Sequence, residues 1–108
     1  MSAVLIAEVT DLKPGEKKKI VVGSKIILLA NVEGQFFAVD NTCTHMGGDL
    51  SLGVLEGKTI ICPKHHAGFD VTSGKNVKDG KLLFIPAKAH DLNAYPITIE
   101  GNQILIDL

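Results

Sequence analysis

The chain contains no tryptophan and no arginine, and only one tyrosine and two cysteines among its 108 residues. All 11 basic residues are therefore lysines, and with 12 acidic residues the formal net charge is −1. The lysines are scattered except for the triplet 17–19, which we interpret as a solvated strand end. Proteins that bind nucleic acid carry a dense basic patch, so that class of function is disfavoured. A chain of this length buries roughly 65% of its unfolded surface, so we expect residues 1–108 to form one domain.

Long hydrophobic runs are also missing. The longest apolar runs, at 3–7, 26–30 and 82–85, fall far short of the about 20 residues that cross a bilayer. The start of the chain lacks the basic end, long apolar segment and cleavage site of a secretory signal. We therefore expect a cytoplasmic protein without a membrane span. In that reducing compartment Cys43 and Cys62 are predicted to be metal ligands rather than a disulfide.

The apolar residues that are present come in short runs rich in Ile, Val and Leu, without a sustained helical period. Turn residues separate these runs, which is typical of an all-β protein. We expect N-terminal strands at 4–9, 19–22, 25–31 and 35–40, the later ones joined as a meander. The C-terminal end alternates apolar and polar residues in a hairpin with strands at 95–100 and 103–108.

The middle of the chain, residues 41–94, has a different pattern. Glycines interrupt every candidate strand, which predicts mainly loops and short strands. Both cysteines and all four histidines lie inside this segment. A loop-rich segment that carries the binding residues on a rigid β scaffold is the usual division between site and frame, so we expect the functional site here.

Two short motifs carry the chemistry: Cys43-Thr44-His45 and Cys62-Pro63-Lys64-His65. Each offers one thiolate and one imidazole, and two such loops can enclose one metal centre. Two cysteines and two histidines are compatible with tetrahedral zinc, although zinc modules commonly group their ligands as a cysteine pair and a histidine pair. The pairing of one cysteine with one histidine in each motif is the feature that distinguishes this site from the common zinc modules.

Residues 43–48 (CTHMGG) resemble the first cluster-binding loop of the Rieske iron-sulfur family, and residues 62–65 (CPKH) resemble the second. The similarity continues through 68–75 and 92–101, and it is closest to small soluble Rieske-type ferredoxins. The resemblance implies an antiparallel β-sandwich in which a loop-rich cluster-binding subdomain, about residues 41–94, is inserted between the N- and C-terminal strands. It also implies a [2Fe-2S] cluster with two ligands on each iron. Those ligands would be Cys43 and Cys62 on one iron and His45 and His65 on the other.

This resemblance implies an electron-transfer protein rather than an enzyme, and no second catalytic constellation is present in the sequence. The expected role is that of a soluble one-electron carrier, with a ferredoxin reductase as donor and a terminal oxygenase or another redox protein as acceptor. Two alternatives stay open. The chain could be a permanently tethered electron-transfer subunit of a larger oxidoreductase, or a structural zinc module that uses the same four ligands.

Four positions depart from the respiratory branch of the family. Gly48 and Lys64 stand where that branch has an additional cysteine in each loop, so no disulfide is expected between the loops. Ala67 and Phe69 stand where it places a serine and a tyrosine hydroxyl near the cluster sulfurs. Hydrogen bonds to sulfur stabilise the more negative reduced cluster, so we expect a reduction potential in the lower part of the family span.

Two further histidines lie outside the predicted ligand set. His66 takes the place of the glycine that usually follows the second histidine ligand, and the spacing favours His65 as the ligand. We interpret His66 as a loop residue near solvent and His90 as a surface or packing residue. Lys64 is predicted to be exposed, as a candidate for docking to a partner, and Asp49 and Asp70 are interpreted as turn residues.

Overall fold

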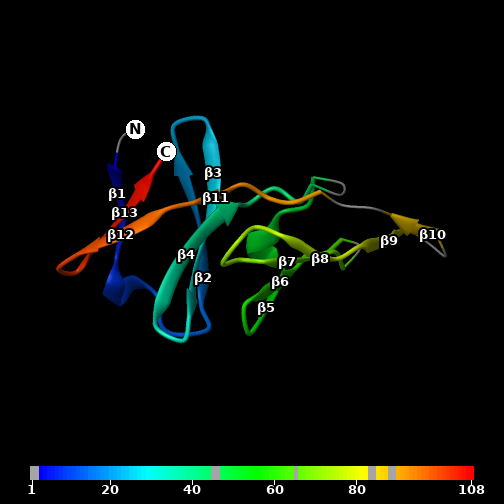
Figure 1. Ribbon diagram of the computed structural model, residues 1–108, viewed down its shortest axis with the longest axis horizontal. Helices are drawn as coiled ribbons and strands as arrows, with labels where there is room; N and C mark the ends of the chain where they lie inside the picture. Colours follow the sequence, from blue (N-terminus) through cyan, green and yellow to red (C-terminus); the bar gives the residue numbers. More distant parts are fainter. Residues whose placement is uncertain (1–2, 45–46, 65, 83–84, 88–89) are drawn as a thin grey trace.

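The computed structural model describes residues 3–44, 47–64, 66–82, 85–87 and 90–108, and its regular structure is nearly all β (Figure 1). Two short 3-10 helices, η1 (Val9–Asp11) and η2 (Leu50–Leu52), accompany the strands. In the described part of the chain, no helix has the length and apolar character needed to span a membrane. The strands are β1 (Ala3–Glu8), β2 (Lys17–Val22), β3 (Lys25–Val32), β4 (Gln35–Asp40), β5 (Val54–Glu56), β6 (Thr59–Ile61), β7 (Gly68–Asp70), β8 (Asn76–Lys78), β9 (Gly80–Leu82), β10 (Ile85–Ala87), β11 (Ala94–Tyr95), β12 (Ile97–Glu100) and β13 (Gln103–Asp107).

Two antiparallel sheets form a sandwich at one end of the molecule, with strand orders β11-β4-β3-β2 and β1-β13-β12. The predicted meander is confirmed as β2, β3 and β4. Its second turn has positive φ at both Glu33 (53°) and Gly34 (91°), the conformation that suits the twist of a two-residue hairpin. The predicted C-terminal hairpin is confirmed as β12 and β13, except that Tyr95, expected in its first strand, pairs with β4 in the other sheet; β13 also pairs with β1. The chain ends therefore meet in one sheet, and the middle segment is inserted between them.

Strand β3 is buried on both of its faces. Ile27 and Leu29 pack into the core between the two scaffold sheets, whereas Leu28 and Ala30 pack against the inserted middle segment. All four side chains are inaccessible to solvent. Successive side chains of a strand point to opposite faces, so a strand between two cores has a continuous apolar run in place of alternation.

The inserted segment contains an ordered four-stranded sheet with the order β5-β6-β7-β8 and a separate hairpin of β9 and β10. Figure 1 shows both at the end of the molecule opposite to β1, β12 and β13, which gives an elongated shape of 48 × 27 × 19 Å. The sequence predicts short strands here, which is confirmed, but strands of three residues are too short to predict their pairing. Both cysteines lie between this sheet and the scaffold.

Candidate metal centre

The first cysteine lies in a tight loop between β4 and η2. An isolated bridge pairs Thr42 with Asp49 at the neck of this loop. Inside it, the backbone N–H of Cys43 donates to the carbonyl of Gly48 (2.8 Å), and the N–H of Gly47 donates to the carbonyl of Cys43 (3.0 Å). Gly47 has a φ of 70°, a left-handed conformation that glycine adopts without strain.

The second cysteine lies in a loop of the same pattern, at the tip of the hairpin formed by β6 and β7. The N–H of Cys62 donates to the carbonyl of Ala67 (2.8 Å), which continues the ladder of the two strands. The N–H of His66 donates to the carbonyl of Cys62 (3.1 Å), and His66 has a φ of 66°. Each cysteine thus begins a six-residue loop whose fifth residue is left-handed.

These two loops bring the cysteines into one buried cluster. Cys43 is 2% exposed and Cys62 is 1% exposed, and both pack among buried apolar side chains of the core. A Cβ atom added to Gly48 would lie 2.6 Å from Sγ of Cys62. The first loop therefore contacts the thiol of the second, and the absence of a side chain at Gly48 provides the space that this sulfur occupies.

The predicted histidine ligands His45 and His65 lie outside the described residues. The residues beside them are consistent with a site at the protein surface, because Thr44, Lys64 and His66 are all exposed. Exposure of Lys64 and of His66 is as predicted. The two buried thiols, together with the two imidazoles that the sequence predicts, would form a donor set that suits a [2Fe-2S] cluster ligated by two cysteines and two histidines.

Backbone and side-chain hydrogen bonds fasten the first loop to the segment that precedes β11. The hydroxyl of Thr44 donates to the carbonyl of His90 (2.5 Å) and accepts from its N–H (2.9 Å). Two residues further on, the N–H of Leu92 donates to the carbonyl of Gly74 (2.7 Å), which holds the same segment against the turn before β8. His90 itself is exposed, as predicted, and the contact uses its backbone.

Ala67 and Phe69 are fully buried in the same core as the two cysteines. Neither side chain has a hydroxyl, so neither donates a hydrogen bond to a sulfur in the site. The apolar surroundings agree with the expectation of a low reduction potential.

Of the acidic residues beside the loops, Asp70 forms the predicted turn. Its Oδ1 accepts hydrogen bonds from the N–H (2.8 Å) and the hydroxyl (2.6 Å) of Thr72. Burial acts to raise the pKa of Asp70, but the hydrogen bonds from Thr72 and the charge of Lys58 outweigh burial and hold this pKa below its usual value. Asp70 is therefore a structural carboxylate that stays ionised.

The prediction that the lysine triplet at 17–19 is solvated holds for Lys18 and Lys19, which are exposed, whereas Lys17 is partly buried. The Nζ atom of Lys17 donates to the carbonyl of Ser51 (2.7 Å), and Nζ of Lys19 donates to Oδ2 of Asp49 (2.8 Å). Both partners lie just after the first cysteine loop. These contacts join residues 30 or more positions apart, which the local pattern of the sequence does not reveal.

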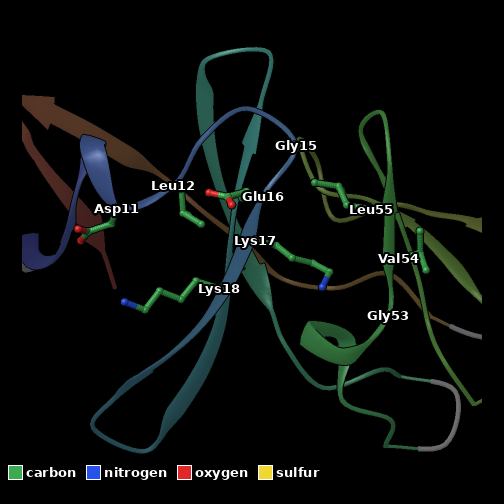
Figure 2. A pocket seen from close by; sticks show the side chains of 9 residues that line it. All are labelled: Asp11, Leu12, Gly15, Glu16, Lys17, Lys18, Gly53, Val54 and Leu55. Carbon is green, nitrogen blue, oxygen red and sulfur yellow. The ribbon is translucent and has the colours of Figure 1, made fainter.

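An open pocket of about 530 Å³ lies where the scaffold meets the inserted segment (Figure 2). Neither Cys43 nor Cys62 lines it, and its walls carry as many acidic as basic side chains. The pocket is therefore separate from the two cysteines. Its lining comprises Asp11, Leu12, Gly15, Glu16, Lys17, Lys18, Gly53, Val54 and Leu55.

Comparison with known proteins gives one consistent result. The family model of the Rieske [2Fe-2S] domain matches residues 2–96. The ferredoxin component of the naphthalene 1,2-dioxygenase system of Pseudomonas aeruginosa is 36% identical over 108 residues, which are 100% of this chain and 94% of that protein. The 3-phenylpropionate/cinnamic acid dioxygenase ferredoxin subunit of Shigella flexneri serotype 5b is 38% identical over 109 residues, covering 100% of this chain and 95% of that protein.

A solved structure agrees in fold over almost the whole chain. It is the complex of reduced oxygenase and oxidized ferredoxin in carbazole 1,9a-dioxygenase, in which one chain superposes with a TM-score of 0.84 at 25% identity. The match covers 96% of the present chain and 100% of the other.

Proposed function

Because this chain belongs to the Rieske [2Fe-2S] domain family, we propose that it carries single electrons from a reductase to the terminal oxygenase of a dioxygenase system. It is an electron-transfer protein of the ferredoxin type and carries a [2Fe-2S] cluster. The relatives are named as ferredoxin components of such systems, and one solved neighbour is a complex of a ferredoxin with an oxygenase. A bound [2Fe-2S] cluster supplies the site for one reversible electron.

We assign Cys43 and Cys62 as the ligands of one iron and His45 and His65 as the ligands of the other. The observation that carries this assignment is the equivalence of the two loops, each of which presents one buried cysteine from its first residue. The position of His66 supports His65 as the fourth ligand. His66 occupies the left-handed turn position that Gly47 occupies in the first loop, which is the place of a turn residue.

We further propose that the chain acts as one domain whose cluster-binding segment is about 41–94, and that it acts in the cytoplasm. The core shared by β3 and both cysteine loops supports one cooperative unit. Use of both cysteines as cluster ligands supports a reducing compartment. The exposed Lys64 and the residues around it form the surface proposed to meet the redox partners, in a small and transient contact.

The first test is the electron paramagnetic resonance spectrum of the purified protein before and after dithionite, together with iron, sulfide and zinc analysis. Two irons, two sulfides and a rhombic reduced signal of the histidine-ligated type are expected. A colourless protein with one zinc would overturn the electron-transfer role. Oxygenase turnover that depends on adding this chain to a purified reductase and oxygenase would then test the proposed partners.

Single substitutions test the ligand assignment. Cys43→Ser is expected to abolish the cluster and to destabilise the fold, because metal binding and folding are coupled in small domains. His65→Ala is expected to lose the histidine-ligated signal, whereas the matched variant His66→Ala keeps it. If His66→Ala lost the signal and His65→Ala retained it, the assignment would be reversed.

A further inference from the structure

Strand β2 sends two lysines to the segment that follows the first cysteine loop. Lys17 and Lys19 lie two positions apart, so their side chains leave the strand on the same face. Figure 2 shows Lys17 pointing from β2 toward the side where η2 lies, whereas Lys18 points to the opposite side of the strand. The Nζ atoms of Lys17 and Lys19 are 2.7 Å from the Ser51 carbonyl and 2.8 Å from Oδ2 of Asp49.

Asp49 hydrogen-bonds to strand β2 of the scaffold and to residues at both ends of the first cysteine loop. Its Oδ2 accepts from Lys19, while its Oδ1 accepts from Nδ2 of Asn41 (2.8 Å) and from the N–H (3.0 Å) and hydroxyl (2.5 Å) of Ser51. Asn41 precedes the first cysteine loop and Asp49 follows it. The N–H of Leu50 also donates to the Asn41 carbonyl (2.9 Å). One carboxylate therefore joins both ends of the loop to β2.

The charge distribution favours this arrangement. Hydrogen bonds from Lys19, then from Ser51 and Asn41, hold the pKa of Asp49 well below its usual value, so the carboxylate is ionised at neutral pH. The side chains of Lys19 and Asp49 are 45% and 30% exposed. An ion pair with this much solvent access contributes little to global stability. Its effect lies in the orientation of the groups that it joins.

We propose that Lys17 and Lys19 are positioning residues of the electron-transfer site, which fix the first cysteine loop to the scaffold through Ser51 and Asp49. The inference rests on the proposed function in one respect, namely that Cys43 and His45 of this loop bind the cluster. Neither lysine is proposed to touch the cluster. Lys17 holds the backbone of Ser51 just after the loop, and Lys19 holds the Asp49 carboxylate that joins the two ends of the loop.

The test compares Lys17→Met, Lys19→Met and the double variant with Lys18→Met in the purified holoprotein. Lys18→Met is the matched control because it removes the same charge from the same strand, on the face that points away from the loop. The measurements are hydrogen–deuterium exchange of residues 41–52, the rate of iron release to a chelator, and the reduction potential.

In the double variant, hydrogen–deuterium exchange in 41–52 and iron release are expected to be about threefold to tenfold faster than in wild type. The effect is modest because the two lost contacts are partly exposed and each contributes little free energy. Exchange in β12 and β13 is expected to be unchanged. In each single variant, which removes the same one charge as Lys18→Met, the reduction potential is expected to shift beyond the shift in Lys18→Met, because the loop geometry changes in addition to the charge. The single variant Lys19→Arg, which retains a donor for Asp49, is expected to keep wild-type values.

A double variant that matches Lys18→Met in loop exchange, iron release and potential would overturn the proposal. A lower unfolding temperature with unchanged loop exchange and potential would also overturn it, since the lysines would then be structural only. Failure of the proposed function is distinguishable from both results. In that case wild-type protein would lack the iron and the reduced signal, while the exchange comparison would still decide whether the lysines fix the loop.

Discussion

Gly47 and His66 occupy the same position in two equivalent loops. Each is the fourth residue after a cysteine, each donates its N–H to that cysteine's carbonyl, and their φ angles are 70° and 66°. Glycine adopts this left-handed conformation in the first loop, whereas a residue with a Cβ atom adopts it in the second. The backbone of the second loop is therefore strained at a position next to a proposed ligand.

His66→Gly is expected to stabilise the protein. A left-handed conformation costs a residue with a Cβ atom about 1–2 kcal/mol, and the extra freedom of glycine in the unfolded chain offsets about 0.5–1 kcal/mol of that gain. A rise of roughly 2–6 °C in the midpoint of thermal unfolding is expected. His66→Ala, which keeps the Cβ atom, is the control and is expected to show no rise. Equal midpoints for the two variants would show that the loop stores no such strain.

Gly48→Ala is expected to expel the cluster, because the added Cβ atom would lie 2.6 Å from Sγ of Cys62. Gly47→Ala is the matched control. It places an alanine at a φ of 70° but meets no atom of the described residues within 4 Å, so it strains the backbone by about 1 kcal/mol without displacing the sulfur. The check is the iron content of both purified variants. If Gly48→Ala retained two irons with an unchanged spectrum, the thiol of Cys62 would not occupy this space.

Much of the scaffold could be predicted from the sequence because its signals are local. The alternation of Ile97 and Ile99 with polar residues, followed by Gly101-Asn102, predicts the hairpin of β12 and β13. The run in β3 indicates a strand, but not that it lies between two cores. That fact depends on where the inserted segment folds back, which no window of the sequence contains.

The predicted ligand set stays a prediction, because the structure describes only the two cysteines of the four ligands. The motifs identify Cys43 and Cys62, which do share one buried cluster. The contacts of Lys17 and Lys19 were missed because their partners are distant in sequence and a row of lysines resembles a solvated surface. Lys17 and Lys19 are two positions apart, and so are their partners Asp49 and Ser51. This matching spacing is a signal that could have suggested the two hydrogen bonds.

Tyr95 is expected to ionise late in an alkaline titration. Burial, followed by the hydrogen bond and the negative charge of Asp40, raises the pKa of Tyr95 to about 12 from 10.0, and its hydroxyl lies 2.6 Å from Oδ1 of Asp40. Because the chain has one tyrosine and no tryptophan, the tyrosinate absorbance reports this residue alone. A difference titration against Tyr95→Phe is expected to show a transition near pH 12.

The same shift predicts how stability depends on pH. The folded protein holds the Tyr95 proton more tightly than the unfolded chain, so this contribution is fully present below pH 10.0 and is lost as the pH rises toward about 12. Tyr95→Phe is expected to cost about 1–2 kcal/mol at neutral pH, through the lost hydrogen bond to a carboxylate. The difference in unfolding free energy between the two proteins is expected to shrink across this window. A difference that stays constant to pH 12 would contradict the raised pKa.

The reduction potential is expected to lie in the lower part of the family span, which runs from about −150 to +300 mV. Ala67 and Phe69 are buried in the same core as the cysteines and have no hydroxyl. The reduced, more negative cluster therefore receives fewer stabilising hydrogen bonds than in the respiratory branch, which lowers the potential. Ala67→Ser is expected to raise the potential by roughly 40–80 mV, which corresponds to a hydrogen bond stronger by about 1–2 kcal/mol in the reduced state. Phe69→Tyr is expected to act in the same direction. Protein-film voltammetry measures each shift.

The control for these substitutions is Ala38→Ser, which adds the same hydroxyl to a buried alanine in the separate core between the scaffold sheets. It is expected to lower stability and to leave the potential unchanged. A wild-type potential well into the positive range would contradict the argument. So would a shift in Ala38→Ser as large as that in Ala67→Ser, because the effect would then follow from general loosening of the protein and not from a donor next to the cluster.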